Sequence, residues 1–454
     1  AMRAEPDDDP SPSSRAPSTS TPDAWTRWLT VANAELAREG VARALRPVQP
    51  RRRRIDQSDA NDAAATCDAR ESTLERWRTN DDDLGESCDG AGTSRALRVF
   101  SGNDYLGLGE HARTRRAAAN AAAAYGCGPR SSALVCGYTD MHRALERELA
   151  RICETEECVL FPSGFAANAT TLPAACGSED CCIFSDALNH ASIVDGCRLA
   201  RQGGATVRTF AHRDYDELER ELKTCSAKRT AVVSDSLFSM DGDYADVERL
   251  ASLKRKYGFL LILDEAHATL VCGERGGGVA QARGRCADVD VHVGTLSKAV
   301  GAHGGFVACS REMKRFLVSR ARGHMFSTAL PAPVIAAALE SLRVFADDPS
   351  IRVKLWRNVD RLNAALAKSP TLATMTQPLV SPIGSIVVGA PEAALAASAE
   401  LLRQGFHVPA IRPPTVPAGT CRLRVALSAS HRDEDIDELV GALERAVKPP
   451  RSRL

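Results

Sequence analysis

One lysine lies where a surface lysine is not expected. Lys298 stands in the string T-L-S-K-A-V-G-A-H-G-G, directly after the apolar run V-D-V-H-V-G. Burial disfavours the charged form of an amine and lowers its pKa, so a buried lysine becomes a usable nucleophile or base. We interpret Lys298 as a residue that forms a Schiff base with a carbonyl group. The nearby glycines allow a ligand to approach the backbone closely.

An acidic residue ends a second apolar run. The string L-L-I-L is followed by Asp264, which predicts a carboxylate at the C-terminal end of a buried strand, where ligands bind in parallel sheets. A buried carboxylate needs a cationic partner, and a protonated ring nitrogen would be one. A cap for the next helix is the structural alternative. His267, three residues further along, is placed to reach the same ligand.

A third string has the composition of an anion site. P-S-G-F-A-A-N, at positions 162–168, follows the apolar run C-V-L-F and precedes a helical pattern. Small residues at a strand-to-helix turn expose backbone N–H groups, and the helix dipole adds positive potential. A phosphate site is the functional interpretation, and an ordinary turn explains the same string.

Alternating strands and helices are expected to position these strings. Helical patterns such as 143–152 and 215–222 separate the apolar runs. This alternation predicts an α/β fold with a mainly parallel sheet and helices on both faces. The expected strands are 158–161, 182–184, 206–210, 231–235, 260–264, 289–294 and 305–309.

Changes in composition divide the chain. We expect a disordered tail (1–23), an N-terminal helix followed by a polar insertion (24–99), a large domain (100–333), a small α+β domain (334–447) and a flexible tail (448–454). In the small domain, strands are expected at 385–388, 407–408 and 423–426, and a helix at 434–447. The run Arg51 to Arg54 is interpreted as a solvated loop, with a nucleic-acid or targeting patch as the alternative.

Charge and cysteine content exclude several classes of protein. The 454 residues carry 58 basic and 58 acidic side chains, so no bulk field attracts nucleic acid or an acidic membrane. We find no apolar run long enough to span a bilayer and no apolar secretory segment at the N-terminus. The 15 cysteines are scattered without a C-x-x-C spacing, so we expect free, buried thiols in a reducing compartment and no metal site.

Taken together, the three strings resemble fold-type I enzymes that use pyridoxal 5′-phosphate (PLP), including the spacing of Asp264 and Lys298 (298 − 264 = 34). The resemblance is to the α-oxoamine synthases, in the plant and algal branch, from about Trp25 to about Val447. Further matching strings are S-G-N-D-Y-L-G-L from position 101, D-A-L-N-H-A-S from position 186, D-S-L-F-S-M-D-G-D from position 235 and A-I-R-P-P-T-V-P-A-G-T from position 410.

The resemblance implies a role for each matching residue. Lys298 would hold PLP and later remove the substrate Cα proton, and Asp264 would keep the ring nitrogen protonated. His190 would stack on the ring, and Ser239 and His267 would contact its phenolic oxygen. The phosphate would be held by Gly164, Phe165 and Thr295, with Ser327 and Thr328 reaching the cofactor of a partner subunit in a homodimer. The residues implied at the substrate are Arg412 and Asn103 at the carboxylate and Arg46 near the acyl chain.

The implied activity is a decarboxylative condensation of an amino acid with an acyl thioester. The residues before T-V-P favour L-alanine and a pimeloyl group, carried by CoA or by a carrier protein, over the relatives that use glycine or serine. Those relatives are 5-aminolevulinate synthase, 2-amino-3-ketobutyrate CoA ligase and serine palmitoyltransferase. A non-catalytic scaffold or regulatory subunit with the same fold is the alternative of another class, and Lys298 argues against it.

The last residues suggest a location. Ser452-Arg453-Leu454 resembles the tripeptide S-K-L that a peroxisomal import receptor reads, and Pro449 and Pro450 would hold it away from the preceding helix. We therefore expect a peroxisomal protein, with the cytoplasm as the alternative.

Overall fold

The computed structural model describes residues 24–38, 48–52, 67–74 and 95–447. It divides the chain into one unit up to Arg46 and a second unit from Pro47 onward. The described part of the first unit is helix α1 (Ala24–Arg38), which falls within the expected N-terminal helix. Arg46, the tail 1–23 and the tripeptide Ser452-Arg453-Leu454 lie outside the described residues, so the expectations placed on them remain predictions.

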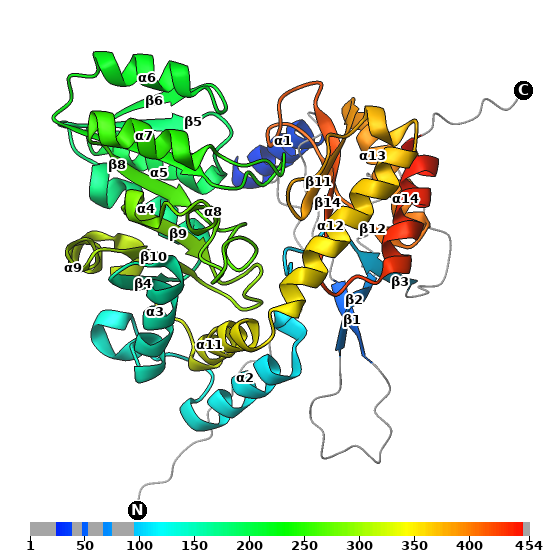
Figure 1. Ribbon diagram of the computed structural model, residues 1–454, viewed down its shortest axis with the longest axis horizontal. Helices are drawn as coiled ribbons and strands as arrows, with labels where there is room; N and C mark the ends of the chain where they lie inside the picture. Colours follow the sequence, from blue (N-terminus) through cyan, green and yellow to red (C-terminus); the bar gives the residue numbers. More distant parts are fainter. Residues whose placement is uncertain (1–23, 39–47, 53–66, 75–94, 448–454) are drawn as a thin grey trace, which may run out of the picture. The chain divides into compact units, whose positions relative to one another are not determined.

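A seven-stranded sheet forms the centre of the larger part of the second unit (Figure 1). All its strands run parallel except β10, which is antiparallel to both of its neighbours. In spatial order the strands are β4 (Glu157–Phe161), β10 (Gly305–Cys309), β9 (Val291–Thr295), β8 (Leu260–Asp264), β7 (Arg229–Asp235), β5 (Cys181–Asp186) and β6 (Thr206–Phe210). Every expected strand of the large domain is present, with its ends shifted by at most two residues.

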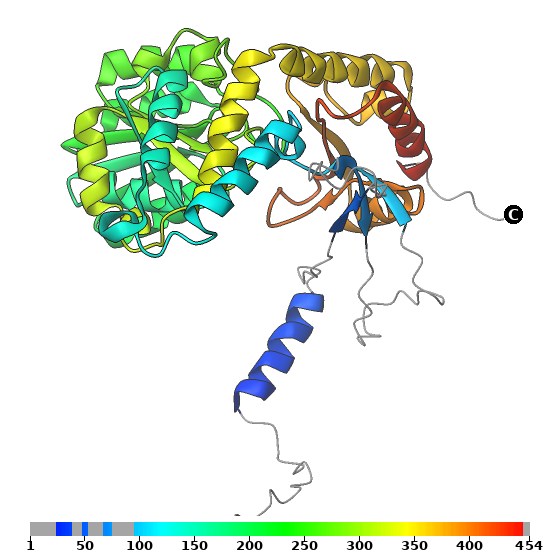
Figure 2. The same ribbon diagram turned by 90° about the horizontal axis from the view of Figure 1, so that it is seen from below.

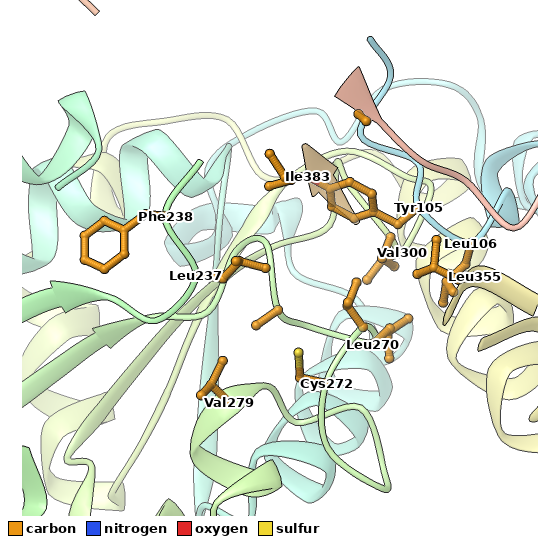
Figure 3. Packing of buried hydrophobic residues seen from close by; sticks show 14 of the residues in the cluster. Tyr105, Leu106, Leu237, Phe238, Leu270, Cys272, Val279, Val300, Leu355 and Ile383 are labelled. Atoms are coloured by element: carbon orange, nitrogen blue, oxygen red, sulfur yellow. The ribbon is translucent and has the colours of Figure 1, made fainter. Parts of the chain in front are cut away.

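Both faces of this sheet are covered, because alternate residues of each central strand enter different cores. In β8, Leu261 and Leu263 join one core and Ile262 joins the other. Figure 3 shows members of the first core, among them Leu237, Phe238, Leu270 and Val300. The helices of this part are α2 (Ala112–Tyr125), α3 (Asp140–Cys153), α4 (Gly164–Cys176), α5 (Ala191–Gln202), α6 (Tyr215–Thr224), α7 (Val247–Tyr257), α8 (Val279–Ala282), α9 (Arg311–Arg320), α10 (Arg322–Met325) and α11 (Ala332–Asp347). Burying both faces explains why the strands read as continuous aliphatic runs.

A smaller α+β region follows α11 in the chain. Its sheet has the order β11 (Ile383–Gly389), β14 (Cys421–Ala426) and β13 (Ala410–Ile411). Its helices are α12 (Ser350–Lys368), α13 (Pro391–Arg403) and α14 (Asp433–Val447). Short single-turn segments complete the set of helices described: η3 (Leu108–Glu110), η4 (Ala133–Gly137), η5 (Cys286–Asp288) and η6 (Leu372–Thr374).

A third sheet joins the start of the second unit to this region (Figure 2). Its order is β1 (Val48–Arg52), β2 (Cys67–Leu74), β3 (Arg95–Val99) and β12 (Phe406–His407), and β3 pairs with β12 in parallel. The expectation of a solvated loop is therefore wrong for Arg51 and Arg52, which pair with β2. Polar side chains do not prevent this pairing, because backbone groups make the ladder and an edge strand tolerates charge.

Two general properties concern the described residues only. No helix among them is long and apolar enough to cross a membrane. The cysteines from Cys127 to Cys421 are free and mostly buried, with Cys127 and Cys136 exposed.

Candidate active site

Four neighbouring strands end at one edge of the large sheet and bring their last residues together. Asp235 ends β7, Asp264 ends β8 and Thr295 ends β9, while His190 follows β5 and begins helix α5. Lys298 lies three residues beyond β9. Because these strands are parallel, their carboxyl ends share one edge, which is where α/β sheets bind ligands.

Lys298 is largely enclosed at this edge. Burial lowers the pKa of its amine to about 8, against the opposing effect of the neighbouring carboxyl groups of Asp264 and Asp235. A substantial fraction of the amine is therefore neutral near pH 8, as a nucleophilic lysine requires. The sequence-based interpretation of Lys298 as a reactive amine stays a prediction, and this largely enclosed environment suits it.

The carboxylate of Asp264 is held in a fixed orientation. Its Oδ1 accepts a hydrogen bond from the backbone N–H of Ala266 at 2.8 Å, and its Oδ2 accepts one from the side-chain amide of Asn168 at 2.5 Å. The Asp264 side chain is nearly buried, with 7 % of the residue exposed. Beside it, burial and the charge of Asp264 raise the pKa of Asp235 well above its ordinary value. The edge therefore offers one firmly oriented acceptor for a protonated ring nitrogen.

His190 caps helix α5 with its own side chain. Its Nδ1 accepts the backbone N–H of Ser192 at 3.2 Å and lies 2.7 Å from the Ser192 hydroxyl. Burial lowers the pKa of His190, and the positive charge of Lys298 acts in the same direction. A neutral imidazole with its proton on Nε2 follows from an Nδ1 that accepts.

A second polar chain starts from His267. Its Nδ1 lies 2.7 Å from the hydroxyl of Tyr105, which donates to Asn103 Oδ1 at 3.3 Å. The same Asn103 oxygen accepts from both terminal nitrogens of Arg424, each at 3.3 Å, and Arg424 Nε donates to the backbone oxygen of Ser239 at 2.7 Å. Burial lowers the pKa of His267 well below its usual range. These hydrogen bonds connect His267, which is expected to contact the phenolic oxygen of PLP, to the buried guanidinium of Arg424.

The expected phosphate turn is closely packed. Ser163 caps α4 by accepting the N–H of Ala166 at 3.1 Å. A Cβ on Gly164 would lie 3.0 Å from Cβ of Thr295, and a Cβ on Gly305 would lie 2.3 Å from the backbone of Ser163. Only glycine allows this approach at position 305. The helix α4 N-terminus is thereby placed beside the Thr295 hydroxyl, an arrangement that suits an anion.

Some expected site residues are partly or fully exposed. Phe165 is 47 % exposed and its ring lies edge-on to that of His190 at 6.5 Å. Ser327 is partly exposed and Thr328 is exposed. Arg412 is partly exposed in the turn after β13.

Sequence reasoning missed four residues that this site contains: Tyr105, Asn168, Asp235 and Arg424. Arg424 had a signal, because an arginine in the apolar run C-R-L-R-V-A must find a polar partner when the strand is buried. It is 5 % exposed. Asp235, like Asp264, ends an apolar run. Asn168 lies in the string P-S-G-F-A-A-N and Tyr105 in S-G-N-D-Y-L-G-L, and neither string indicates a role for these two side chains.

The residues present fit bound PLP. The set comprises an amine with a lowered pKa, an oriented carboxylate, a neutral imidazole and a glycine-lined helix N-terminus, and these match the aldehyde, ring nitrogen, ring face and phosphate of that cofactor. Such a sheet, with these groups at its carboxyl edge, defines a fold-type I PLP-dependent transferase.

Comparisons with known proteins agree with this class. The chain belongs to the family "Aminotransferase class I and II", whose model matches residues 98–443. An 8-amino-7-oxononanoate synthase of Arabidopsis thaliana is 50 % identical over 366 residues, covering 78 % of this chain and 75 % of the relative. One of Anaeromyxobacter dehalogenans is 48 % identical over 349 residues, covering 77 % and 86 %.

Solved structures give the same fold. Serine palmitoyltransferase of Sphingomonas wittichii superposes with a TM-score of 0.78 at 28 % identity, covering 94 % of this chain and 98 % of that one. The 8-amino-7-oxononanoate synthase of Francisella tularensis superposes with a TM-score of 0.65 at 26 % identity, covering 77 % and 98 %.

Proposed function

We propose that the chain catalyses the 8-amino-7-oxononanoate synthase reaction: L-alanine and pimeloyl-CoA give 8-amino-7-oxononanoate, CoA and carbon dioxide. The observation that carries the proposal is the identity of 50 % and 48 % with relatives of that name over most of the chain. The reactive groups that this chemistry needs lie together at one sheet edge. The product serves biotin biosynthesis.

The chain's own residues account for the proton transfers. Bound PLP supplies the electron sink for the carbanion at Cα. Lys298 Nζ removes the Cα proton and later returns a proton to the same carbon, which its lowered pKa suits. Asp264 holds the proton of the ring nitrogen. His190 would stack on the ring face and take part in the loss of carbon dioxide, as the sequence resemblance implies.

The substrate carboxylate needs a cation, and two arginines are available. Arg412 was the residue implied by the sequence resemblance. Arg424 is the better candidate by position, because it is buried and bonds the Asn103 side chain that was expected at the same carboxylate. We assign the carboxylate to Arg424, whose planar guanidinium can donate two parallel hydrogen bonds.

A steady-state assay tests the activity. Purified protein with PLP is given L-alanine, glycine or L-serine, each with pimeloyl-, succinyl-, acetyl- or palmitoyl-CoA, and CoA release is measured together with the amino ketone. We expect the highest kcat/KM for L-alanine with pimeloyl-CoA. Preference for serine with palmitoyl-CoA would instead support the function of the serine palmitoyltransferase structures that superpose on this chain. Comparing kcat/KM for a pimeloyl carrier protein and for pimeloyl-CoA in the same assay shows which of the two is the preferred donor of the pimeloyl group.

The assembly is proposed to be a homodimer. Exposed apolar side chains gather where two segments meet: Ser132 pairs with Thr328, and nearby Leu134, Val135 and Phe326 are 51 %, 76 % and 66 % exposed. Exposed apolar surface of this kind is typical of an interface. A second copy would cover it and bring Ser327 and Thr328 to the neighbouring cofactor.

Mixing two inactive variants tests this sharing. Lys298→Ala and the double variant Ser327→Ala/Thr328→Val are denatured together and refolded. If sites are shared across the dimer, the mixed dimers contain one intact site, and about a quarter of wild-type activity returns for random pairing. If both variants are folded and the mixture regains no activity, the sites are not shared. A catalytically active monomer in sedimentation would also contradict the shared site.

A further inference from the structure

We propose that Asn168 and Ser192 are positioning residues that link the Asp264 carboxylate to the His190 imidazole and fix the orientation and tautomer of that imidazole. We call these four residues the Asn168 relay. The inference rests on the proposed PLP site and adds to it two residues that would touch neither the cofactor nor the substrate.

The relay is continuous by distance. The side-chain nitrogen of Asn168 donates to Asp264 Oδ2 at 2.5 Å and to Ser192 Oγ at 3.0 Å. Ser192 Oγ lies 2.7 Å from His190 Nδ1. Asn168 comes from the second turn of α4 and Ser192 from the first turn of α5. Two helices and strand β8 are therefore joined at the point where the cofactor ring would lie.

The polarity of the relay follows from its acid end. A carboxylate only accepts hydrogen bonds, so Asn168 must turn its NH₂ group toward Asp264. The second hydrogen of that group then occupies a lone pair of Ser192 Oγ, and the serine hydroxyl is left to donate to His190 Nδ1. The imidazole therefore keeps its own proton on Nε2. The serine hydroxyl thus acts together with the backbone N–H of Ser192, and both require Nδ1 of His190 to accept.

Burial makes the relay effective and also costly. Asn168 and Ser192 are each 1 % exposed, so water does not replace their hydrogen bonds. Asn168 Oδ1 is buried and has no hydrogen-bond partner among the described residues. An unpaired buried carbonyl oxygen costs stability, which the two hydrogen bonds donated by the amide group must offset. Asparagine suits position 168 because its side-chain amide has two hydrogens, one for Asp264 and one for Ser192.

The chain offers a matched control for each residue. Asn358 resembles Asn168 because it is buried, and its amide donates two hydrogen bonds, to the backbone oxygens of Ser428 and His431. Its Oδ1 also has no partner among the described residues. Unlike Asn168, it lies on α12, which follows the large sheet in the chain. Ser341 is a buried serine on α11 that bonds Thr114. Asn358→Ala and Ser341→Ala remove comparable buried hydrogen bonds without touching the relay.

The first test measures His190 directly. In holoenzyme labelled with ¹³C-histidine, NMR gives the pKa and tautomer of His190, which is assigned with His190→Gln. Ser192→Ala removes the shorter of the two contacts at Nδ1 and keeps the backbone N–H of residue 192, so it should raise the pKa of His190 and weaken the preference for the tautomer with the proton on Nε2. Ser341→Ala should leave both unchanged. An unaltered His190 in folded, PLP-loaded Ser192→Ala protein overturns the relay.

The second test separates positioning from packing. Asn168→Ala should lower kcat at least tenfold with the KM for L-alanine changed less than about twofold, and should alter the visible circular dichroism of bound PLP. Asn358→Ala should lower thermal stability while kcat stays near wild type. Asn168→Asp should regain activity as the pH falls, because a protonated aspartate can again donate to Asp264. Equal kcat losses in both asparagine variants, with unchanged dichroism, would make Asn168 a packing residue.

Failure of the relay can be told from failure of the proposed function. If wild-type protein condenses L-alanine with pimeloyl-CoA while Ser192→Ala leaves His190 unchanged, only the relay is wrong. If wild-type protein lacks that activity but Ser192→Ala shifts His190 as expected, the relay holds and the reaction must be another one. Should Asn168→Ala fail to fold, the serine variant still decides.

Discussion

Asp235 and Asp264 lie directly opposite each other at the carboxyl ends of β7 and β8, as a register pair of parallel strands. Both are nearly buried, and Lys298 is the cation that both influence. Two carboxyl groups this close in a buried site do not ionise equally. Because Asp264 receives two hydrogen bonds and Asp235 keeps one oxygen without a partner among the described residues, we assign the negative charge to Asp264.

This pair leads to a prediction for the attachment of PLP. The rate at which apo-protein binds PLP covalently, followed by absorbance, should rise with pH and level off above about 8, since the neutral amine of Lys298 is the reacting form. Asp264→Asn removes a charge that raises the pKa of Lys298. The pH at which the rate of PLP binding is half its maximum should therefore fall in this variant. Asp235→Asn should leave the midpoint nearly unchanged. A larger shift for Asp235→Asn would reverse the assignment of the charge. Borohydride reduction and peptide mapping should place the label on Lys298 in each variant.

The two candidate arginines are separated by conservative variants. Arg424→Lys should raise the KM for L-alanine at least tenfold, about 1.4 kcal/mol, because an ammonium cannot make the paired hydrogen bonds of a guanidinium. Arg412→Lys should change that KM by less than about threefold. Steady-state kinetics at saturating acyl thioester gives both values. The opposite ranking would return the carboxylate to Arg412, as the sequence resemblance implied.

A partly buried ion cluster of His212, Asp186 and Asp243 should make stability depend on pH. Although burial opposes it, hydrogen bonds of 3.0 Å to both Asp186 and Asp243 raise the pKa of His212 to about 9. The contribution of His212 to the free energy of unfolding is therefore complete below the ordinary histidine pKa of 6.5. It is lost as the pH rises through about 9. It amounts to at most about 3 kcal/mol. Urea unfolding from pH 6 to 9.5 should show a decline for wild type that is absent in His212→Gln. Parallel curves for the two proteins would exclude this role.

The peroxisomal location remains a prediction, because no described residue bears on it. A fluorescent protein fused to the N-terminus, with Leu454 left free, should give punctate signal that overlaps a peroxisomal marker. Removing Ser452-Arg453-Leu454 should disperse it, and replacing the tripeptide with S-K-L should restore it. Diffuse fluorescence of the full chain that is the same after the deletion would favour the cytoplasm.

The large sheet and part of the site could be predicted because their signals are local. Each apolar run that ends in a polar residue, such as the one before Asp264, predicts both a strand and the position of its last side chain. Lys298 is placed by the same reasoning. The expected strand at 289–294 begins two residues early, since Asp290 uses its carboxylate to accept the N–H of Leu261 instead of continuing the strand.

The rest depends on contacts between distant parts of the chain. Arg424 meets Asn103 across 321 positions, and Tyr105 meets His267 across 162. No periodicity within a short window contains that information. The pairing of β1 with β2 was missed for a related reason: its residues are polar, so neither strand shows the apolar alternation that would predict it.

The parallel pairing of β3 with β12 also has a consequence for the order in which the protein can fold. The segment from β3 to Tyr105 leaves the ribosome early, but its partners come late: Phe100 bonds His407 and Ala426, and Tyr105 bonds Ala429. At about 5–20 residues per second, synthesis leaves this segment without its partners for tens of seconds. Asn103 and Tyr105 can take their places in the site only after the last strand of the small sheet is made. Folding should therefore end with the closing of this long loop, and a chain that stops before β14 should have a formed large sheet but no complete substrate pocket.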